Sequence, residues 1–218
     1  MTRALRFYRT SVGKKVVVAV TGLILFGYVA IHMLGNLQLF MGPERLNSYA
    51  ATLKSNLALL WAARLVLLAA GITHVVATLQ LTRMSQRSRP DGYYYKDVIE
   101  ANYASRTMRW TGPILALFVI YHLLHFTTGT VHPRFDHADV YANVVTGFRV
   151  WSVAAFYIAA MVVLGFHLWH GAWSMFQSVG LNNPRADSLL HRFAAIATVV
   201  IVIGFISIPL AILARLVS

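Results

Sequence analysis

The chain has 218 residues, of which 58% are hydrophobic and only 12% are charged, and its formal net charge is +12. Its mean hydropathy of +0.62 exceeds what a water-soluble core of this size requires, so the composition predicts an integral membrane protein without a sizeable soluble domain. The absence of cysteine excludes disulfides, thiolate nucleophiles and cysteine-ligated iron–sulfur clusters.

Five apolar runs reach the length of about 20 residues that a membrane-spanning helix needs. They lie near residues 15–40, 57–82, 108–131, 150–176 and 190–216. We therefore expect an all-α membrane protein with a single transmembrane domain over residues 1–218, in which the first four helices form an up-and-down bundle. The first run follows five basic residues, as a secretory signal would, but it is longer than a signal's apolar region and ends without a small-residue cleavage site, so we expect it to be retained.

The basic residues are distributed unevenly between the two ends of the expected bundle. Thirteen of the 19 lysines and arginines lie at the ends of spans, or in loops, on the same side of the membrane as the amino terminus. Because Lys and Arg near span ends favour the cytoplasmic side, we expect a multi-pass protein of the cell inner membrane with a cytoplasmic amino terminus. The charge is spread over loop ends and no soluble module carries it, which argues against nucleic-acid binding.

Each of the first four runs contains a histidine, at positions 32, 74, 122 and 167. Ionisable side chains inside a span are costly and usually face the bundle interior. With a rise of about 1.5 Å per residue, His74 and His167 lie about 12–14 Å from the inner end of their spans, and His32 and His122 about 16–26 Å from it. Parallel helices face each other across a four-helix bundle, so the predicted pairs are His32/His122 and His74/His167.

Two imidazoles opposed across a bundle are suited to holding a flat metal macrocycle, and two layers indicate two haems. Glycines near three of the histidines, at positions 35, 71 and 171, would leave room for such a ring. Two alternatives remain at this point. Each histidine could bond a neighbouring helix, or a discrete zinc or copper ion could bind if His125 or His170 joined a pair.

Four segments carry a family likeness, and they lie at residues 11–36 (SVGKKVVVAVTGLILFGYVAIHMLGN), 63–81 (ARLVLLAAGITHVVATLQL), 104–127 (ASRTMRWTGPILALFVIYHLLHFT) and 166–180 (FHLWHGAWSMFQSVG). Together they resemble the single-chain cytochrome b membrane anchor of succinate:quinone oxidoreductases, the five-helix, two-haem type. The resemblance implies that the axial ligands of two haems b are His32, His74, His122 and His167. His125 and His170 each follow a ligand position by three residues, so helical geometry alone would also accept them.

The resemblance also implies the function of the chain and its partners. It implies a non-catalytic subunit of succinate dehydrogenase that passes electrons to menaquinone from a flavoprotein and an iron–sulfur subunit on the cytoplasmic face. The chain itself has no G-x-G-x-x-G fingerprint and no cysteine for a cluster. Some fumarate-reducing relatives carry a glutamate two residues before the fourth ligand, where this chain has Gly165, which favours succinate oxidation.

Several further residues are candidates for binding a haem or the quinone. Arg64, about 15 Å nearer the outside than His74, is a candidate partner of an outer haem propionate. At the inner side the candidates are Ser105, Arg106 and Lys15, with lipid phosphates as the alternative partners of the cations. The quinone could bind at the outer end or at the inner end, with candidate residues Glu44, Asn47 and Tyr49 at the outer end and Ser11, Ser105 and Arg106 at the inner end.

The basic stretch at residues 83–109, which contains three successive tyrosines, is the expected dock for the soluble subunits, with a lipid-headgroup belt as the alternative. Other functions also remain open at this stage. They are a fumarate reductase anchor, a quinone-linked cytochrome of the hydrogenase or formate dehydrogenase type, and a haem-free proton-coupled transporter. The oligomeric state of the complex is open, and the loop histidines His132, His137 and His191 have no assigned role.

Overall fold

The computed structural model describes residues 3–88, 103–180, 183, 185 and 187–217, and this part of the chain is helical without any strand. Within these residues, five helices are long and apolar enough to cross a membrane. Their bounds are Ser11–Asn36 (α2), Leu57–Arg87 (α4), Tyr103–Phe126 (α5), Trp151–Ser178 (α7) and Asp187–Leu213 (α8). The predicted fold class, an all-α membrane protein with five spans, is confirmed.

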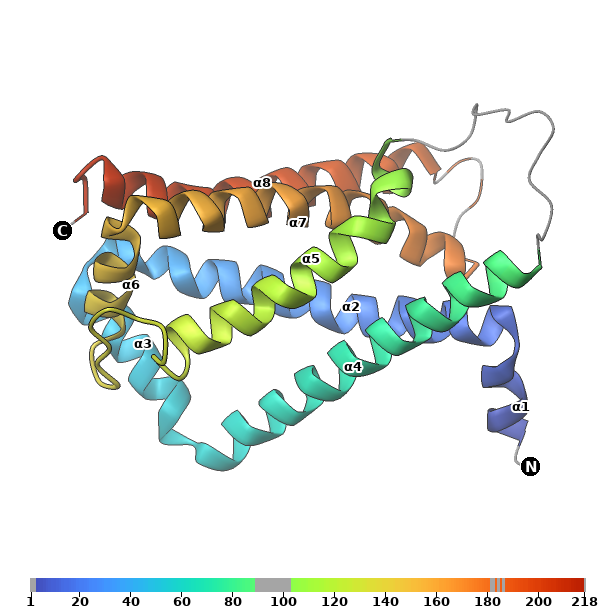
Figure 1. Cartoon of the computed structure of the whole chain (residues 1–218), viewed down its shortest axis with the longest axis horizontal. Coiled ribbons are helices and arrows are strands. Elements are labelled where there is room, and N and C mark those ends of the chain that lie inside the picture. Colours follow the sequence, from blue (N-terminus) through green and yellow to red (C-terminus); the bar gives the residue numbers. More distant parts are fainter. Residues whose placement is uncertain (1–2, 89–102, 181–182, 184, 186, 218) are drawn as a thin grey trace.

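Shorter helices lie at the two ends of the bundle (Figure 1). The helix α1 (Arg3–Arg9) precedes α2 at one end. At the other end lie the 3-10 helix η1 (Leu37–Met41), α3 (Pro43–Ser55) and α6 (Val140–Arg149), together with the carboxyl-terminal end of α8. The two ends of the chain thus lie at opposite ends of the molecule, as five spans require.

The helix α2 lies at the centre of the bundle. It packs against α4 on one side and α7 on the other, α5 packs against α7, and α8 covers α7 and part of α2. Around the bundle the order is therefore α4, α2, α7, α5. This order makes α2 and α5 one diagonal pair and α4 and α7 the other.

Small side chains line the contacts between the long helices. Ala154, Ala160 and Ala172 of α7, Ala77 of α4 and Ala194 of α8 are all buried. Small residues let helix backbones approach closely, which stabilises helix packing where lipid removes the usual hydrophobic driving force. Large apolar side chains instead cover the outside, where lipid solvates them.

Two long helices end earlier than their apolar runs. The run predicted to reach residue 131 stops at Phe126 in α5, because the Thr128 amide donates to the Leu123 carbonyl and Gly129 adopts a φ of +74°. The run predicted to reach residue 216 stops at Leu213 in α8, where Arg215 has a φ of 58° and the Leu216 amide donates to the Ala211 carbonyl. The left-handed Arg215 closes the end of α8, whereas in α5 the left-handed Gly129 follows the last hydrogen-bonded turn, and apolar composition reveals neither feature.

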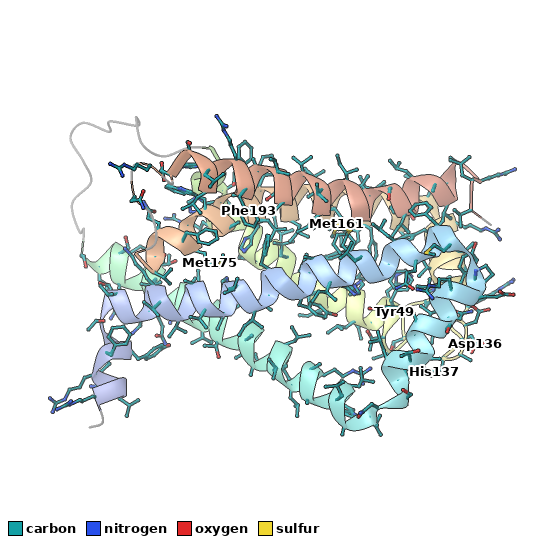
Figure 2. All side chains as sticks on the ribbon, turned by 180° about the vertical axis from the view of Figure 1, so that it is seen from behind. Tyr49, Asp136, His137, Met161, Met175 and Phe193 are labelled. Atoms are coloured by element: carbon teal, nitrogen blue, oxygen red, sulfur yellow. The ribbon has the colours of Figure 1, made fainter. Side chains whose placement is uncertain are left out.

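Polar contacts join α3 to the segment before α6. Asn47 donates to the Asp139 carboxylate (2.9 Å) and accepts from the Tyr141 amide (3.0 Å), and Lys54 donates to the His137 carbonyl (2.7 Å). Figure 2 shows Tyr49, Asp136 and His137 together at this end of the molecule. These contacts fix the cap of short helices over the ends of the long ones.

Candidate functional site

The four histidines predicted at matched depths lie in two close pairs. The ring centres of His32 on α2 and His122 on α5 are 5.8 Å apart, with an angle of 82° between the ring planes. The ring centres of His74 on α4 and His167 on α7 are 6.4 Å apart, with an angle of 61°. Each pair joins diagonally opposed helices, so the side chains meet across the core of the bundle.

The spacing of both pairs fits a metal ion held between two imidazoles. Two nitrogen–metal bonds of about 2.0–2.1 Å, plus about 1.1 Å from each nitrogen to its ring centre, place the centres about 6 Å apart. Each ring can rotate about its own nitrogen–metal axis, so the angle between the planes is not restricted. In the described part of the chain, no three His, Asp or Glu side chains are arranged to hold a metal ion together. Neither His125 nor His170 therefore completes a discrete zinc or copper site.

Threonines hold the pair nearer the inner end. The His74 Nδ1 atom lies 3.1 Å from the Thr21 hydroxyl of α2, and the His167 Nδ1 atom lies 3.2 Å from the Thr111 hydroxyl of α5. In both cases the threonine belongs to the helix adjacent to that of the histidine. A bond at Nδ1 leaves Nε2 as the nitrogen available for a metal.

The pair nearer the outer end has different neighbours. His32 stacks on Tyr28, with ring centres 5.4 Å apart, and its Nε2 atom lies 3.3 Å from the Asn36 amide nitrogen. The His122 Nδ1 atom lies 3.4 Å from the Tyr157 hydroxyl of α7. In this pair, aromatic packing and the Tyr157 hydroxyl, which is also near His125, take the place of the threonine contacts.

The space predicted beside the histidines exists at two of the three glycines. A Cβ atom added at Gly71 or Gly171 would meet no neighbouring heavy atom within 4 Å. At Gly35 the expectation is wrong, because the Tyr49 hydroxyl would lie only 2.8 Å from such an atom. Tyr49 fills that position and packs α3 onto α2. The free space therefore flanks the inner pair.

His125 and His170 make other contacts. The His125 ring is wholly buried, its Nδ1 atom lies 3.0 Å from the Tyr157 hydroxyl, and its ring stacks on that of His132 at 4.9 Å. His125 thus belongs to the packing between α5 and α6, whereas His122 faces His32. The His170 ring lies 6.5 Å from that of Trp173, and its buried Nδ1 atom has no partner among the described residues.

The loop histidine His132 has a structural role. Its Nε2 atom lies 2.8 Å from the Asn143 carbonyl oxygen of α6, and its Nδ1 atom accepts from the Arg134 amide. The imidazole therefore bridges the segment after α5 to α6. No role was assigned to this residue from the sequence, which gave no indication of these bonds.

The predicted cationic partners are located as follows. The Arg64 guanidinium lies over the Trp61 ring, 5.1 Å from its centre. Its charge also interacts with Tyr28, whose ring stacks on that of His32. Arg64 therefore lies near the outer pair. Lys15 is exposed. Ser105 and Arg106 lie outside the residues whose side chains the structure describes.

The proposed quinone residues also have defined surroundings. The Asn47 amide is occupied by its contacts with Asp139 and Tyr141, whereas Glu44 is exposed in the first turn of α3. Ser11 is exposed at the start of α2. In the basic stretch, Arg83 and Arg87 are exposed at the end of α4, and Arg89 and the three tyrosines lie outside the described residues.

Gly165 lies where α7 meets α8. A Cβ atom at this position would come within 3.2 Å of a Val202 methyl group. A larger side chain there would require the Val202 side chain to shift by a few tenths of an ångström.

The threonines and Tyr157 were missed by reasoning from the sequence. A signal for the threonines is present, however, because Thr21 and Thr111 each precede a predicted ligand by eleven residues, which is three helical turns. No comparable spacing identifies Tyr157, whose contacts depend on how α7 rotates against α5.

A family model described as "Succinate dehydrogenase/Fumarate reductase transmembrane subunit" matches residues 82–206, which is more than half of the chain. The matched region includes His122 and His167. No curated protein and no solved structure matches the chain.

Proposed function

The chain belongs to the family of succinate dehydrogenase/fumarate reductase transmembrane subunits, and from this premise we propose that it is the membrane-anchor cytochrome b of a succinate dehydrogenase. In this role it holds two haems b, accepts electrons from an iron–sulfur subunit and delivers them to menaquinone. A flavoprotein subunit completes the complex on the cytoplasmic face.

The proposal rests on two pairs of imidazoles at two depths in the bundle. The ring centres within each pair are 5.8 and 6.4 Å apart, respectively. Bound between two imidazoles, haem b would supply one-electron transfer, and its iron would offer no open site for oxygen or substrate. The chain orients the four imidazoles from diagonal helices. It also surrounds them with apolar side chains, such as Phe205 beside His32 and Phe118 beside His122, that limit access of water.

The chain lacks the groups that succinate oxidation requires, so other subunits must carry out that reaction. Oxidation of succinate needs a flavin and a route for its electrons, and the sequence has neither a dinucleotide fingerprint nor a cysteine. The soluble subunits supply both. Arg83 and Arg87, exposed at the inner end of α4, are available to contact them.

Succinate oxidation is favoured over fumarate reduction by Gly165. Electron transfer across the membrane potential costs or releases about 2.3 kcal/mol per charge per 100 mV, so a fumarate reductase working against it benefits from a compensating proton path. A carboxylate at position 165 would supply part of such a path. Here the position is a glycine packed near Val202.

Haem content of the purified complex tests the ligand assignment. We expect two low-spin haems b per chain in the wild type, with loss of one in H32A or H122A and loss of the other in H74A or H167A. The matched controls are H125A and H170A, which should keep both haems if the complex assembles. A wild-type complex without haem, or ligand variants that keep both haems, would contradict the proposal.

The identity of the co-purifying chains tests the electron donor. We expect mass spectrometry to find a flavoprotein and an iron–sulfur protein, and we expect added succinate to reduce the haems. A hydrogenase or formate dehydrogenase subunit in their place would retain the cytochrome and change its donor.

A further inference from the structure

The helices α2 and α5 carry the same short sequence pattern. Residues 21–32 read TGLILFGYVAIH and residues 111–122 read TGPILALFVIYH, with Thr, Gly, Ile, Leu, Val and His at equivalent positions. Eleven residues at about 100° each bring the threonine within about 20° of the histidine around the helix. Each helix therefore presents a hydroxyl and, about 16 Å further along, an imidazole to the same side.

The two threonines make equivalent contacts. Thr21 lies 3.1 Å from the Nδ1 atom of His74 on α4, and Thr111 lies 3.2 Å from the Nδ1 atom of His167 on α7. In each case the histidine is on the helix that packs beside the threonine's own helix. The pair of α2 and α4 thus repeats the arrangement of α5 and α7.

The single proton of the Thr21 hydroxyl determines the direction of its bond to His74. The hydroxyl donates to the Val17 carbonyl oxygen at 2.7 Å. It therefore accepts from His74, for which the backbone carbonyl of Val18 is a second acceptor, and this places a hydrogen on Nδ1 and the free electron pair on Nε2. In α5 the Thr111 hydroxyl has a local acceptor three residues back, the Met108 carbonyl oxygen, at the longer distance of 3.4 Å.

We infer that Thr21 and Thr111 are positioning residues of the inner haem site, where each accepts the Nδ1 hydrogen of one axial histidine. The two bonds fix the tautomer and the orientation of the rings, and they increase electron donation from the imidazoles to the iron. This inference rests on the proposed cytochrome function. It extends that function by assigning one hydroxyl to each ligand of a single haem.

The outer pair does not share this arrangement. The His122 Nδ1 atom lies 3.4 Å from the Tyr157 hydroxyl, which is closer to His125 at 3.0 Å. The His32 Nε2 atom lies near Asn36 of its own helix. Loss of the threonine hydroxyls should therefore affect one haem and leave the other unchanged.

Valine and serine variants of both threonines test the inference in the assembled complex. T21V and T111V remove the hydroxyl at nearly constant volume, and T21S and T111S retain it. The matched control is T198V, because Thr198 is buried in α8 and its hydroxyl has no hydrogen-bond partner among the described residues. The readouts are the midpoint potential of each haem by redox titration and its low-spin electron paramagnetic resonance signal.

We expect T21V and T111V to raise the potential of the same haem, the one that H74A removes, because weaker imidazole donors stabilise ferric iron less. The serine variants and T198V should retain the wild-type potentials. Loss of the inner haem in a valine variant, with retention in the matching serine variant, would also support the inference.

Three results would overturn the inference. They are unchanged potentials and spectra in both valine variants, shifts on two different haems, and serine variants that behave like the valine variants. If the wild type carries two haems and any of these results is found, only the positioning role fails. If the wild type carries no bis-histidine haem, the proposed function fails and the positioning role fails with it.

Discussion

Tyr157 supplies the hydrogen-bond partner of a wholly buried imidazole. Its hydroxyl lies 3.0 Å from the Nδ1 atom of His125, whose Nε2 atom has no partner among the described residues. Removal of the hydroxyl would leave both ring nitrogens of His125 without a partner in an apolar setting. A buried polar group without a partner is costly, so this one hydroxyl contributes to the stability of the outer half of the bundle.

The variant Y157F should therefore destabilise the protein by about 1–3 kcal/mol, the usual cost of an unsatisfied buried polar group. The measurement is thermal unfolding in detergent. The control is Y121F, which removes a hydroxyl from the same aromatic cluster where no hydrogen bond is formed within the described residues. Equal unfolding temperatures for Y157F and Y121F would contradict this role of Tyr157.

The space beside Gly71 gives a second test at the scale of a residue. The variant G71L should reduce haem binding at the inner site without unfolding the protein, because no neighbouring heavy atom lies within 4 Å of the added Cβ. The measurement is haem per chain together with thermal unfolding. The control I72F adds bulk at the neighbouring, exposed position. Full haem content in G71L would contradict the prediction, because it would show that the haem does not occupy the space beside Gly71.

The short helices α3 and α6 depend on a few polar contacts. Asp139 caps α6 by accepting from the Ala142 amide at 2.9 Å, and it also accepts from Asn47 of α3. These bonds favour the charged carboxylate, first through the Ala142 amide and then through Asn47, and they hold the pKa of Asp139 below its ordinary value. The cap thus joins two elements that are about 90 residues apart in the chain.

The lowered pKa of Asp139 predicts a pH-dependent contribution to stability. Its folded-state pKa lies below the unfolded value of about 3.9, so the contribution is complete above that value and is lost as the pH falls through the folded pKa. We expect D139A to cost about 0.5–2 kcal/mol at pH 7, a typical loss for a helix cap. The difference in unfolding temperature between the wild type and D139A should narrow near pH 3.

The control for Asp139 is D139N, which keeps a side-chain oxygen able to cap α6 but cannot titrate. It should lie closer to the wild type than D139A at pH 7. A difference between the wild type and D139A that stays constant from pH 7 to pH 3 would assign the effect to packing instead of the charged cap.

At the scale of the whole molecule, the arrangement of the ends determines membrane orientation. The start of α2 and the ends of α4 and α7 lie at one end of the bundle, whereas α3, α6 and the end of α8 lie at the other (Figure 1). The excess of Lys and Arg at the first end predicts that it is cytoplasmic. The soluble partners would then dock at that end.

Single cysteines test this orientation, because the chain has none of its own. We expect a membrane-impermeant maleimide to label S55C, at the end of α3, in intact spheroplasts. It should label S88C, after α4, only in inverted vesicles. Both serines are exposed, so the two variants serve as controls for each other. The reverse pattern of labelling would reverse the predicted orientation.

The five spans, the all-α class and the pairing of histidines by depth could be predicted from the sequence, because they depend on apolar length and a constant rise per residue. The histidines stand out in this chain since an ionisable group inside a span is rare and costly. Element ends were less predictable. The left-handed Arg215 closes α8 and the left-handed Gly129 redirects the chain after α5, while in both places the apolar run continues.

Which side chains meet is visible only once the helices are packed together. The tertiary structure separates His122, which faces His32, from His125, which packs on Tyr157 and His132. It also fills the position beside Gly35 with Tyr49. Such contacts depend on how each helix rotates about its axis. In a membrane both the lipid-facing and the inward-facing sides of a helix are apolar, so the sequence pattern leaves that rotation undefined.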